Sequence, residues 1–182
     1  GDHRDTIFVA GTERSGTTWL ADLINYRSRF RMIFEPFWAL RVPESEPFSS
    51  NQYLRARDSS SQYLEAAGKI LSGQVRNSWS DKYHRTFLSR RRLIKDVRTN
   101  LMLRWMYENF PGMPLVLILR HPCAVASSQS RADHQFLGLG AHFLGQPELV
   151  DDFLQPHLEA IQSPNSAFEE KILRWCIQNA VP

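Results

Sequence analysis

The chain contains few of the residues from which disulfide scaffolds, metal sites and membrane spans are built. Its 182 residues include two cysteines, Cys123 and Cys176, which are too few for a disulfide framework or a cysteine-based metal site. Each falls in an apolar helical pattern, so we expect buried free thiols. No run of about 18 apolar residues is present, so no membrane-spanning helix is expected. The first residues, Gly1 to Thr6, are polar and lack the apolar centre of a signal peptide.

Lysine is also scarce, since only four of the 22 basic residues are lysines. Against 19 acidic residues the formal net charge is +3, far from the dense basic surface of a nucleic-acid-binding protein. Arginine, the dominant cation, suits planar bidentate contacts with phosphate. With 42% hydrophobic and 23% charged residues, the composition is that of an ordinary globular domain. We therefore expect no nucleic-acid partner, and the charge is compatible with an anionic ligand.

Short apolar runs alternate with helical patterns along the chain. Thr6–Ala10 is apolar without alternation, as in a strand buried on both faces, and Leu115–Leu119 has the clearest pattern of a central strand. These strand–helix units predict an α/β fold, a three-layer α/β/α arrangement with a mostly parallel sheet. The other predicted strands are Arg31–Phe34 and Leu93–Lys95; the predicted helices are Thr17–Tyr26, Ser59–Arg76, Leu101–Phe110, Cys123–Arg131, Glu148–Ile161 and Phe168–Asn179; and loops are expected at Pro43–Ser50 and, as a mobile glycine-rich stretch, Phe136–Gly145.

A glycine-rich segment, Gly11–Thr18, connects the first predicted strand to the first predicted helix. In an open α/β sheet this position lies beyond the carboxyl ends of the strands, where ligands bind. The two glycines allow a sharp turn and a close approach of the backbone to a ligand. The N–H groups at the start of the helix favour an anion, and the hydroxyls of Ser15, Thr17 and Thr18 add donors. The segment therefore predicts a loop for phosphate or sulfate, of the kind found in P-loop NTPase-like folds.

The loop departs at one position from the nucleoside-triphosphate pattern Gly-x4-Gly-Lys-[Ser/Thr]. Thr17 stands where a lysine would reach the β- and γ-phosphates, and a cation lies inside the loop instead, at Arg14. This arrangement suits a single phosphate that carries one transferable sulfuryl group, with Arg14 near the bridging oxygen. The alternative is a glycine- and serine-rich turn with an incidental arginine, which the flanking strand and helix disfavour.

A second anion site is predicted at the end of Leu115–Leu119. Arg120 follows that strand, Pro122 suits the first turn of the next helix, and Ser128 lies eight positions after the arginine. An arginine at a strand end and a serine one or two helical turns later can converge on one phosphate. Ser127 is the alternative partner if the helix has a different register.

The segments Arg14–Leu20 and Leu117–Ser128 together resemble the sulfotransferases that use 3′-phosphoadenosine 5′-phosphosulfate (PAPS) as donor. The resemblance spans about Thr6–Arg131. It implies that PAPS is a co-substrate, that the first segment holds the 5′-phosphosulfate, and that the second holds the 3′-phosphate. The implied donor-binding residues are Arg14, Ser15, Gly16, Thr17, Thr18, Trp19, Arg120 and Ser128, of which Arg14 is also a catalytic cation.

Two further segments, Phe34-Glu35-Pro36 and Leu93–Arg98, are similar to those of carbohydrate-type and bacterial sulfotransferases. The resemblance implies that Glu35 is the catalytic base and that the acceptor is a small molecule or carbohydrate, with a sugar or natural-product hydroxyl favoured. Pro36 disfavours helix at Glu35 and leaves its carboxylate at a strand-to-loop corner. We expect no metal, because a sulfuryl group carries less negative charge than a phosphoryl group and no clustered carboxylates are present.

Several residues have two interpretations. His134 and His142 are the next candidates for the base, or exposed or structural residues. Lys95 and Arg98 could shape the acceptor or adenine site, or be solvated charges at a strand end, and Trp38 could do the same or belong to the core. The run Arg90-Arg91-Arg92 could bind a polyanionic acceptor, or be a solvated entrance to a strand.

Family members usually continue well beyond this length, so we expect residues 1–182 to form a single sulfotransferase domain that is incomplete at its C-terminus. A P-loop kinase or NTPase is an alternative function, but position 17 lacks the lysine that it requires. A nucleotide-binding module without catalysis is another. We expect a cytoplasmic protein if Gly1 is the native start, and one in the Golgi lumen if the start is truncated. The sequence does not indicate an oligomeric state.

Overall fold

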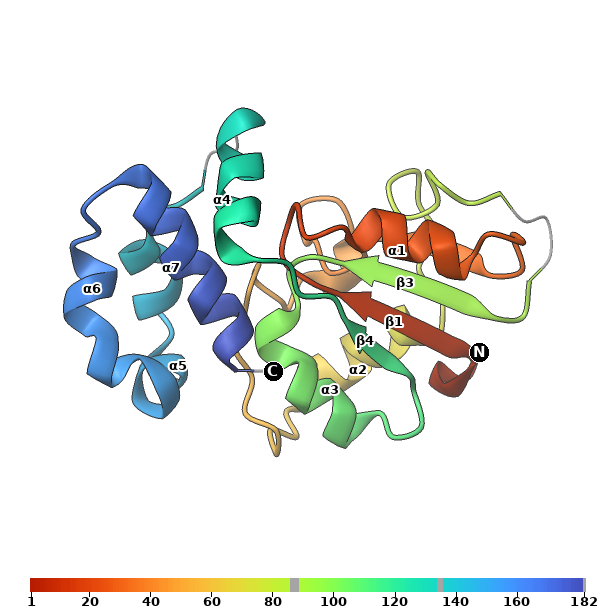
Figure 1. Ribbon diagram of the computed structural model, residues 1–182. Helices are drawn as coiled ribbons and strands as arrows, with labels where there is room; N and C mark the ends of the chain where they lie inside the picture. The colour runs from red at the N-terminus through yellow and green to blue at the C-terminus, as the bar shows by residue number, and fades with distance from the viewer. Residues whose placement is uncertain (86–88, 134–135, 182) are drawn as a thin grey trace.

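A four-stranded parallel sheet forms the centre of the fold, as the computed structural model shows for residues 1–85, 89–133 and 136–181 (Figure 1). The strands lie in the order β2-β3-β1-β4. Phe8 is paired with Ile94 on one side and Leu115 on the other. The strands are β1 (Thr6–Ala10), β2 (Arg31–Phe34), β3 (Arg92–Asp96) and β4 (Leu115–Leu117). The sequence predicted the first two strands with these bounds, and its parallel sheet is confirmed.

The prediction that Leu115–Leu119 is a central strand is wrong. Its ordered part, β4, lies at the edge of the described sheet and stops at Leu117, and its residues are only half-buried. The N–H of Ile118 still donates to the carbonyl of Ala10 at 3.0 Å, after which the chain turns into the next helix. An apolar run of this kind indicates that the strand packs against helices, but it does not show whether the strand has a neighbouring strand on each side.

Helices cover both faces of the sheet. Because successive side chains of a strand point to opposite faces, each strand contributes to two cores. Val9 and Leu93 pack toward α1 (Thr17–Ile24) on one face. Phe8 and Ile94 pack on the other face in a core that includes residues of α2 (Ser61–Leu71) and α3 (Leu103–Asn109). This arrangement confirms the predicted three-layer α/β/α architecture.

The C-terminal part of the chain adds a helical group beside the sheet, where α7 (Ala167–Ala180) packs against α4 (Pro122–Arg131) (Figure 1). This group has its own core, with Phe143, Leu149 and Ile177 buried in it. Its shorter elements are α5 (Pro147–Leu149), α6 (Leu158–Gln162), the π-helical turns η4 (Gly140–Leu144) and η5 (Val150–Leu154), and the 3-10 turn η6 (Gln155–His157). The remaining 3-10 turns are η1 (His3–Asp5), η2 (Pro43–Ser45) and η3 (Asn100–Met102).

Three sequence predictions fail in this C-terminal group. The expected helix Glu148–Ile161 is divided into the short pieces α5, η5, η6 and α6; Pro156, which lacks the N–H that a continuous α-helix needs, accounts for the break at η6. The expected loop Phe136–Gly145 contains a π-helical turn anchored by the buried ring of Phe143. Cys123 and Cys176 are both exposed rather than buried, because each lies on the outward side of its helix.

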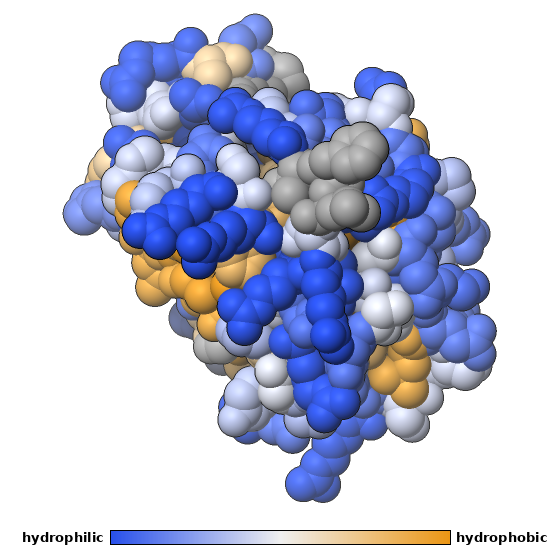
Figure 2. Space-filling model, turned by 90° about the vertical axis from the view of Figure 1, so that its right-hand side faces the viewer, coloured by the Kyte–Doolittle hydropathy of each residue, from blue (hydrophilic) through white to orange (hydrophobic). Residues whose placement is uncertain are grey.

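The amino ends of the strands lie on the side of the sheet opposite the glycine-rich loop Gly11–Thr18. Figure 2 shows this side of the molecule, where hydrophilic surface predominates over smaller hydrophobic areas. The first residue of β3, Arg92, is buried, and its Nε donates to the Thr6 hydroxyl at 2.8 Å. Arg92 therefore has a structural contact at the strand entrance, distant from the carboxyl ends of the strands. No helix of the described ranges is long and apolar enough to cross a membrane.

Candidate active site

The loop between β1 and α1 turns sharply through two residues in the left-handed region. Arg14 and Gly16 both have positive φ values, 70° and 101°. Inside the loop, Ser15 donates both its N–H and its hydroxyl to the carbonyl of Thr12, at 3.1 and 2.6 Å. Helix α1 then begins at Thr17, and no side chain caps it. Its first N–H groups are therefore available to an anion at the carboxyl end of β1.

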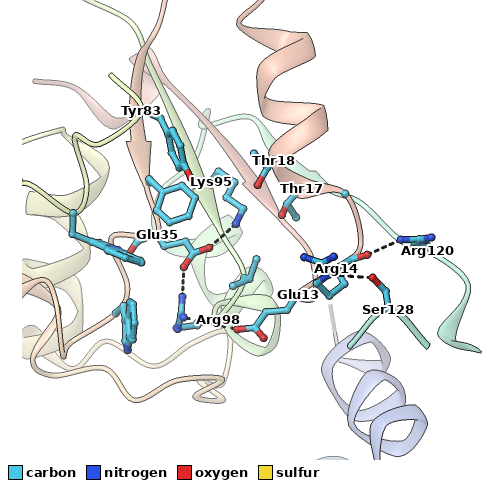
Figure 3. Close-up of a pocket in the computed structure, with 15 residues that line it drawn as sticks. Glu13, Arg14, Thr17, Thr18, Glu35, Tyr83, Lys95, Arg98, Arg120 and Ser128 are labelled. Atoms are coloured by element: carbon cyan, nitrogen blue, oxygen red, sulfur yellow. Dashed lines mark hydrogen bonds and ion pairs between the residues drawn. The ribbon is translucent and has the colours of Figure 1, made fainter. Parts of the chain in front are cut away.

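The loop borders a cleft of about 540 Å³ at the carboxyl ends of the strands (Figure 3). One part of the cleft carries the two predicted anion motifs, and the other carries the corner after β2 and the end of β3. Its lining residues are Glu13, Arg14, Gly16, Thr17, Thr18, Phe34, Glu35, Trp38, Trp79, Tyr83, Lys95, Val97, Arg98, Arg120 and Ser128.

The two predicted anion motifs are in direct contact. The Nε of Arg14 donates to the Ser128 hydroxyl at 3.1 Å, and Arg120 donates from Nη1 to the Arg14 carbonyl at 3.0 Å (Figure 3). Ser127, the alternative to Ser128, instead accepts a hydrogen bond from Arg131 at 3.0 Å and does not line the cleft. The helix register therefore brings Ser128 into the cleft, 114 positions away in sequence from Arg14.

Glu35 lies at the centre of the other half of the cleft, held by two cations. Its Oε1 is 2.6 Å from the Nζ of Lys95, and its Oε2 is 2.6 Å from Nη1 of Arg98 (Figure 3). All three side chains are largely buried, with exposed fractions of 10%, 5% and 13%. Lys95 and Arg98 are therefore not the solvated charges that the sequence allowed as an alternative.

The net effect of these contacts on Glu35 is a lowered pKa. Burial by itself raises the pKa of the carboxyl group, but the charges and hydrogen bonds of Lys95 and then Arg98 outweigh it. Glu35 is consequently ionised throughout the neutral range. It is an acceptor-only group with lone pairs beyond the two that these cations use, so it can still accept a proton from a third donor.

Asp96, which sequence analysis did not single out, fixes this corner. It is fully buried, and its Oδ2 and Oδ1 accept the backbone N–H groups of Phe37 and Arg98 at 2.9 and 2.8 Å. The carboxylate thus ties the turn after β2 to the end of β3, which places Glu35 beside Arg98. Glu35 itself has a φ of 42°, an uncommon backbone conformation for a residue other than glycine. Burial raises the pKa of Asp96.

Four aromatic rings line the cleft beside Glu35: Phe34, Trp38, Trp79 and Tyr83. Trp79 makes edge contacts with Trp38 and Phe34, at centroid distances of 4.7 and 5.3 Å, and donates its indole N–H to the Glu35 carbonyl at 3.3 Å. Trp38 is half-buried and borders the cleft. The roles of Trp79 and Tyr83 had no signal in the sequence, because the segment between α2 and β3 has no helical or strand periodicity.

Three predicted residues lie away from the cleft. The Trp19 side chain is 66% exposed, and Ser15 is buried with its hydroxyl used inside the loop. His142 borders a separate cavity of about 350 Å³, where its Nε2 contacts the amide nitrogen of Asn51 at 3.2 Å. Burial and then the charge of Arg174 lower the pKa of His142 to about 4. His134, the other histidine considered as a base, falls outside the described residues.

Metal-ligand side chains do not gather anywhere in the described part of the chain: it contains no group of three or more His, Cys, Asp or Glu residues that could hold an ion. The charged groups of the cleft are instead cations and the two carboxylates of Glu13 and Glu35. Such a cleft suits a ligand with several negative charges.

A family model described as "Sulfotransferase family" matches residues 6–173. This range includes the loop after β1, the Glu35 corner, the end of β3 and the Arg120–Ser128 motif. No curated protein and no solved structure matches the chain.

Proposed function

The chain belongs to the sulfotransferase family, and from this premise we propose that it transfers a sulfuryl group from PAPS to a hydroxyl acceptor. The contact between the two anion motifs carries the proposal, since Arg14 in the loop bonds to Ser128 and accepts from Arg120. PAPS has one anionic group at its 5′ position and another at its 3′ position. A nucleoside triphosphate instead carries its phosphates as one chain at the 5′ position. The loop that binds such a chain requires a lysine where this sequence has Thr17.

In this proposal the loop holds the 5′-phosphosulfate. The N–H groups of Gly16, Thr17 and Thr18 and the two threonine hydroxyls donate to the phosphate, with the positive end of α1 behind them. Arg120 and Ser128 hold the 3′-phosphate through charge-assisted hydrogen bonds.

The reaction is an in-line displacement at sulfur. The acceptor oxygen forms a bond to sulfur while the bond from sulfur to the 5′-phosphate oxygen breaks, and that oxygen takes the electron pair. Arg14 and the loop N–H groups stabilise the negative charge that develops on the leaving phosphate. The acceptor proton passes to Glu35.

The lowered pKa of Glu35 is compatible with this role. In a loose transition state the acceptor oxygen becomes acidic only as its bond to sulfur forms, so a weak base that is fully ionised at neutral pH can accept the proton late. Lys95 and Arg98 keep that base charged and fix its orientation. The acceptor hydroxyl approaches along the aromatic side of the cleft, where rings such as Trp38 and Trp79 suit a sugar or natural-product ring.

A binding and transfer experiment tests the proposal. Calorimetry compares 3′,5′-adenosine bisphosphate, the product of the donor, with ATP–Mg²⁺, and transfer of radiolabelled sulfate from PAPS to a panel of hydroxyl acceptors follows. We expect the bisphosphate to bind in preference to ATP–Mg²⁺ and label to appear on an acceptor. Preference for ATP–Mg²⁺ contradicts the donor. Bisphosphate binding without transfer to any acceptor would favour a nucleotide-binding module without catalysis.

A further inference from the structure

Two exposed cations that the proposed chemistry does not use, Lys82 and Arg41, lie over aromatic rings beside Glu35. The ammonium of Lys82 lies 3.7 Å from the ring centroid of Trp79 and 3.8 Å from that of Phe34. The guanidinium of Arg41 lies 5.5 Å from Trp38 and 5.8 Å from Trp79. All three of these rings line the cleft.

Both cations contact aromatic rings rather than an acidic partner among the described residues. Within those ranges no carboxylate lies within ion-pair distance of Lys82 or Arg41, whereas Lys95 and Arg98, which line the cleft, are paired. Burial lowers the pKa of Lys82, the charge of Glu35 opposes this shift, and the charges of Lys95 and Arg98 add to it. An anion placed beside Lys82 would oppose this lowering of its pKa, because it would stabilise the charged ammonium.

The charges of the cleft divide into a donor group and an acceptor group. Arg14 and Arg120 belong to the anion motifs, where the proposed donor supplies the negative charge. Lys95 and Arg98 share the carboxylate of Glu35, and Arg98 also lies 3.8 Å from Glu13. With donor bound, the positive charge that still lacks an anionic partner is therefore on Lys82 and Arg41, over the aromatic rings.

We propose that the acceptor is a ring compound that carries a negative charge, with its ring against Trp38 and Trp79 and its anionic group between Lys82 and Arg41. This inference rests on the proposed sulfotransfer and adds the class of acceptor. The rings supply apolar surface for a sugar or aryl ring, and the cations that lie over them supply selectivity for an anion. A neutral acceptor of the same shape would leave both cations without an anionic partner.

The test uses the complex of the protein with 3′,5′-adenosine bisphosphate, in which acceptors bind without reacting. Calorimetry compares two matched pairs of probes: methyl β-glucuronide with methyl β-glucoside, and 4-hydroxybenzoate with 4-hydroxybenzamide. We expect the anionic member of at least one pair to bind about tenfold or more tightly, as one charge-assisted contact provides. Lys82→Met and Arg41→Met should each reduce that preference, with no change in the dissociation constant of the bisphosphate. Lys69→Met, which removes an exposed lysine of α2 away from the cleft, is the matched control.

The outcomes separate this inference from the donor proposal. Failure of the bisphosphate to bind contradicts the PAPS proposal and the inference together. If the bisphosphate binds, equal affinity within both pairs, no binding of either anionic probe, or a preference that survives both substitutions overturns the inference alone. Loss of bisphosphate affinity in Lys82→Met would also overturn it, because it would assign that lysine to the donor.

Discussion

The substitution Glu35→Gln tests the proposed base with little change in shape. Gln keeps the volume of the side chain but cannot accept a proton from the acceptor hydroxyl. Loss of a general base typically lowers turnover by a factor of about 10²–10⁴. Affinity for 3′,5′-adenosine bisphosphate should be unchanged or higher, because the substitution removes a negative charge beside Lys95 and Arg98.

The contacts of Glu35 indicate that the same substitution also lowers the stability of the protein. Gln leaves Lys95 and Arg98 as buried cations without their carboxylate partner, and breaking a buried ion pair typically costs about 3–5 kcal/mol. At about 2–4 °C per kcal/mol for a chain of this size, Tm should fall by about 6–20 °C. Kinetics must therefore be measured well below the lowered Tm, with circular dichroism to show that the variant is folded.

A double variant separates the catalytic effect from the structural one. Glu35→Gln with Lys95→Met removes one of the two unpaired cations, so we expect part of the lost stability to return while turnover stays low. Glu65→Gln, on the exposed surface of α2, is the control for the same chemical change away from the cleft. If folded Glu35→Gln binds bisphosphate and turns over within about threefold of the parent protein, Glu35 is not the base.

Three other predictions concern the same cleft. The pKa of Glu35 is lowered in the folded state from its ordinary 4.5, so its stabilising contribution is complete above about pH 4.5 and is lost as pH falls through the folded pKa. Tm and turnover should therefore not respond to Glu35 ionisation near neutral pH, and both should decrease in acid. A titration midpoint above pH 5 that Glu35→Gln abolishes would contradict the lowered pKa. Arg120→Ala should weaken binding of 3′,5′-adenosine bisphosphate by about 10–100-fold and binding of 5′-AMP by less, since it removes a charged contact to the 3′-phosphate as well as the hydrogen bond to the Arg14 carbonyl; equal losses for both ligands in calorimetry would refute that assignment. Asp96→Asn should lower the free energy of unfolding by about 1–3 kcal/mol in urea titrations, because the new amide NH2 faces one of the two backbone N–H groups, of Phe37 or Arg98, from which the carboxylate accepts hydrogen bonds. Unchanged stability would show that other contacts hold the turn after β2 against the end of β3.

The sequence was sufficient where the signal is local. Thr6–Ala10 and Arg31–Phe34 are continuous apolar or mixed runs bounded by turns, and the structure gives both the same limits. The loop between the first strand and the first helix was also predictable, because its signal lies in neighbouring glycines, hydroxyls and one arginine.

Features that depend on contacts between residues far apart in the sequence could not be predicted from it. Lys95 and Glu35 are 60 positions apart, so nothing local shows that they neutralise each other or that both are buried. Leu115–Leu119 has the composition of a central strand, but which strands lie beside it is decided by topology. Trp79, Tyr83 and Lys82 come from an irregular segment, whose path across the cleft is determined by the packing of its rings against Phe34.

The position of Arg14 has a consequence for ligands smaller than the donor. Its side chain contacts Ser128 and its carbonyl accepts from Arg120, so one residue of the loop after β1 connects to both members of the Arg120–Ser128 motif. A fragment that orders one motif therefore orders part of the other, and two separate monophosphate fragments should bind with positive cooperativity. The cleft would therefore select ligands by the distance between their two anionic groups. Nucleotides with the same number of charges in other positions should bind less tightly.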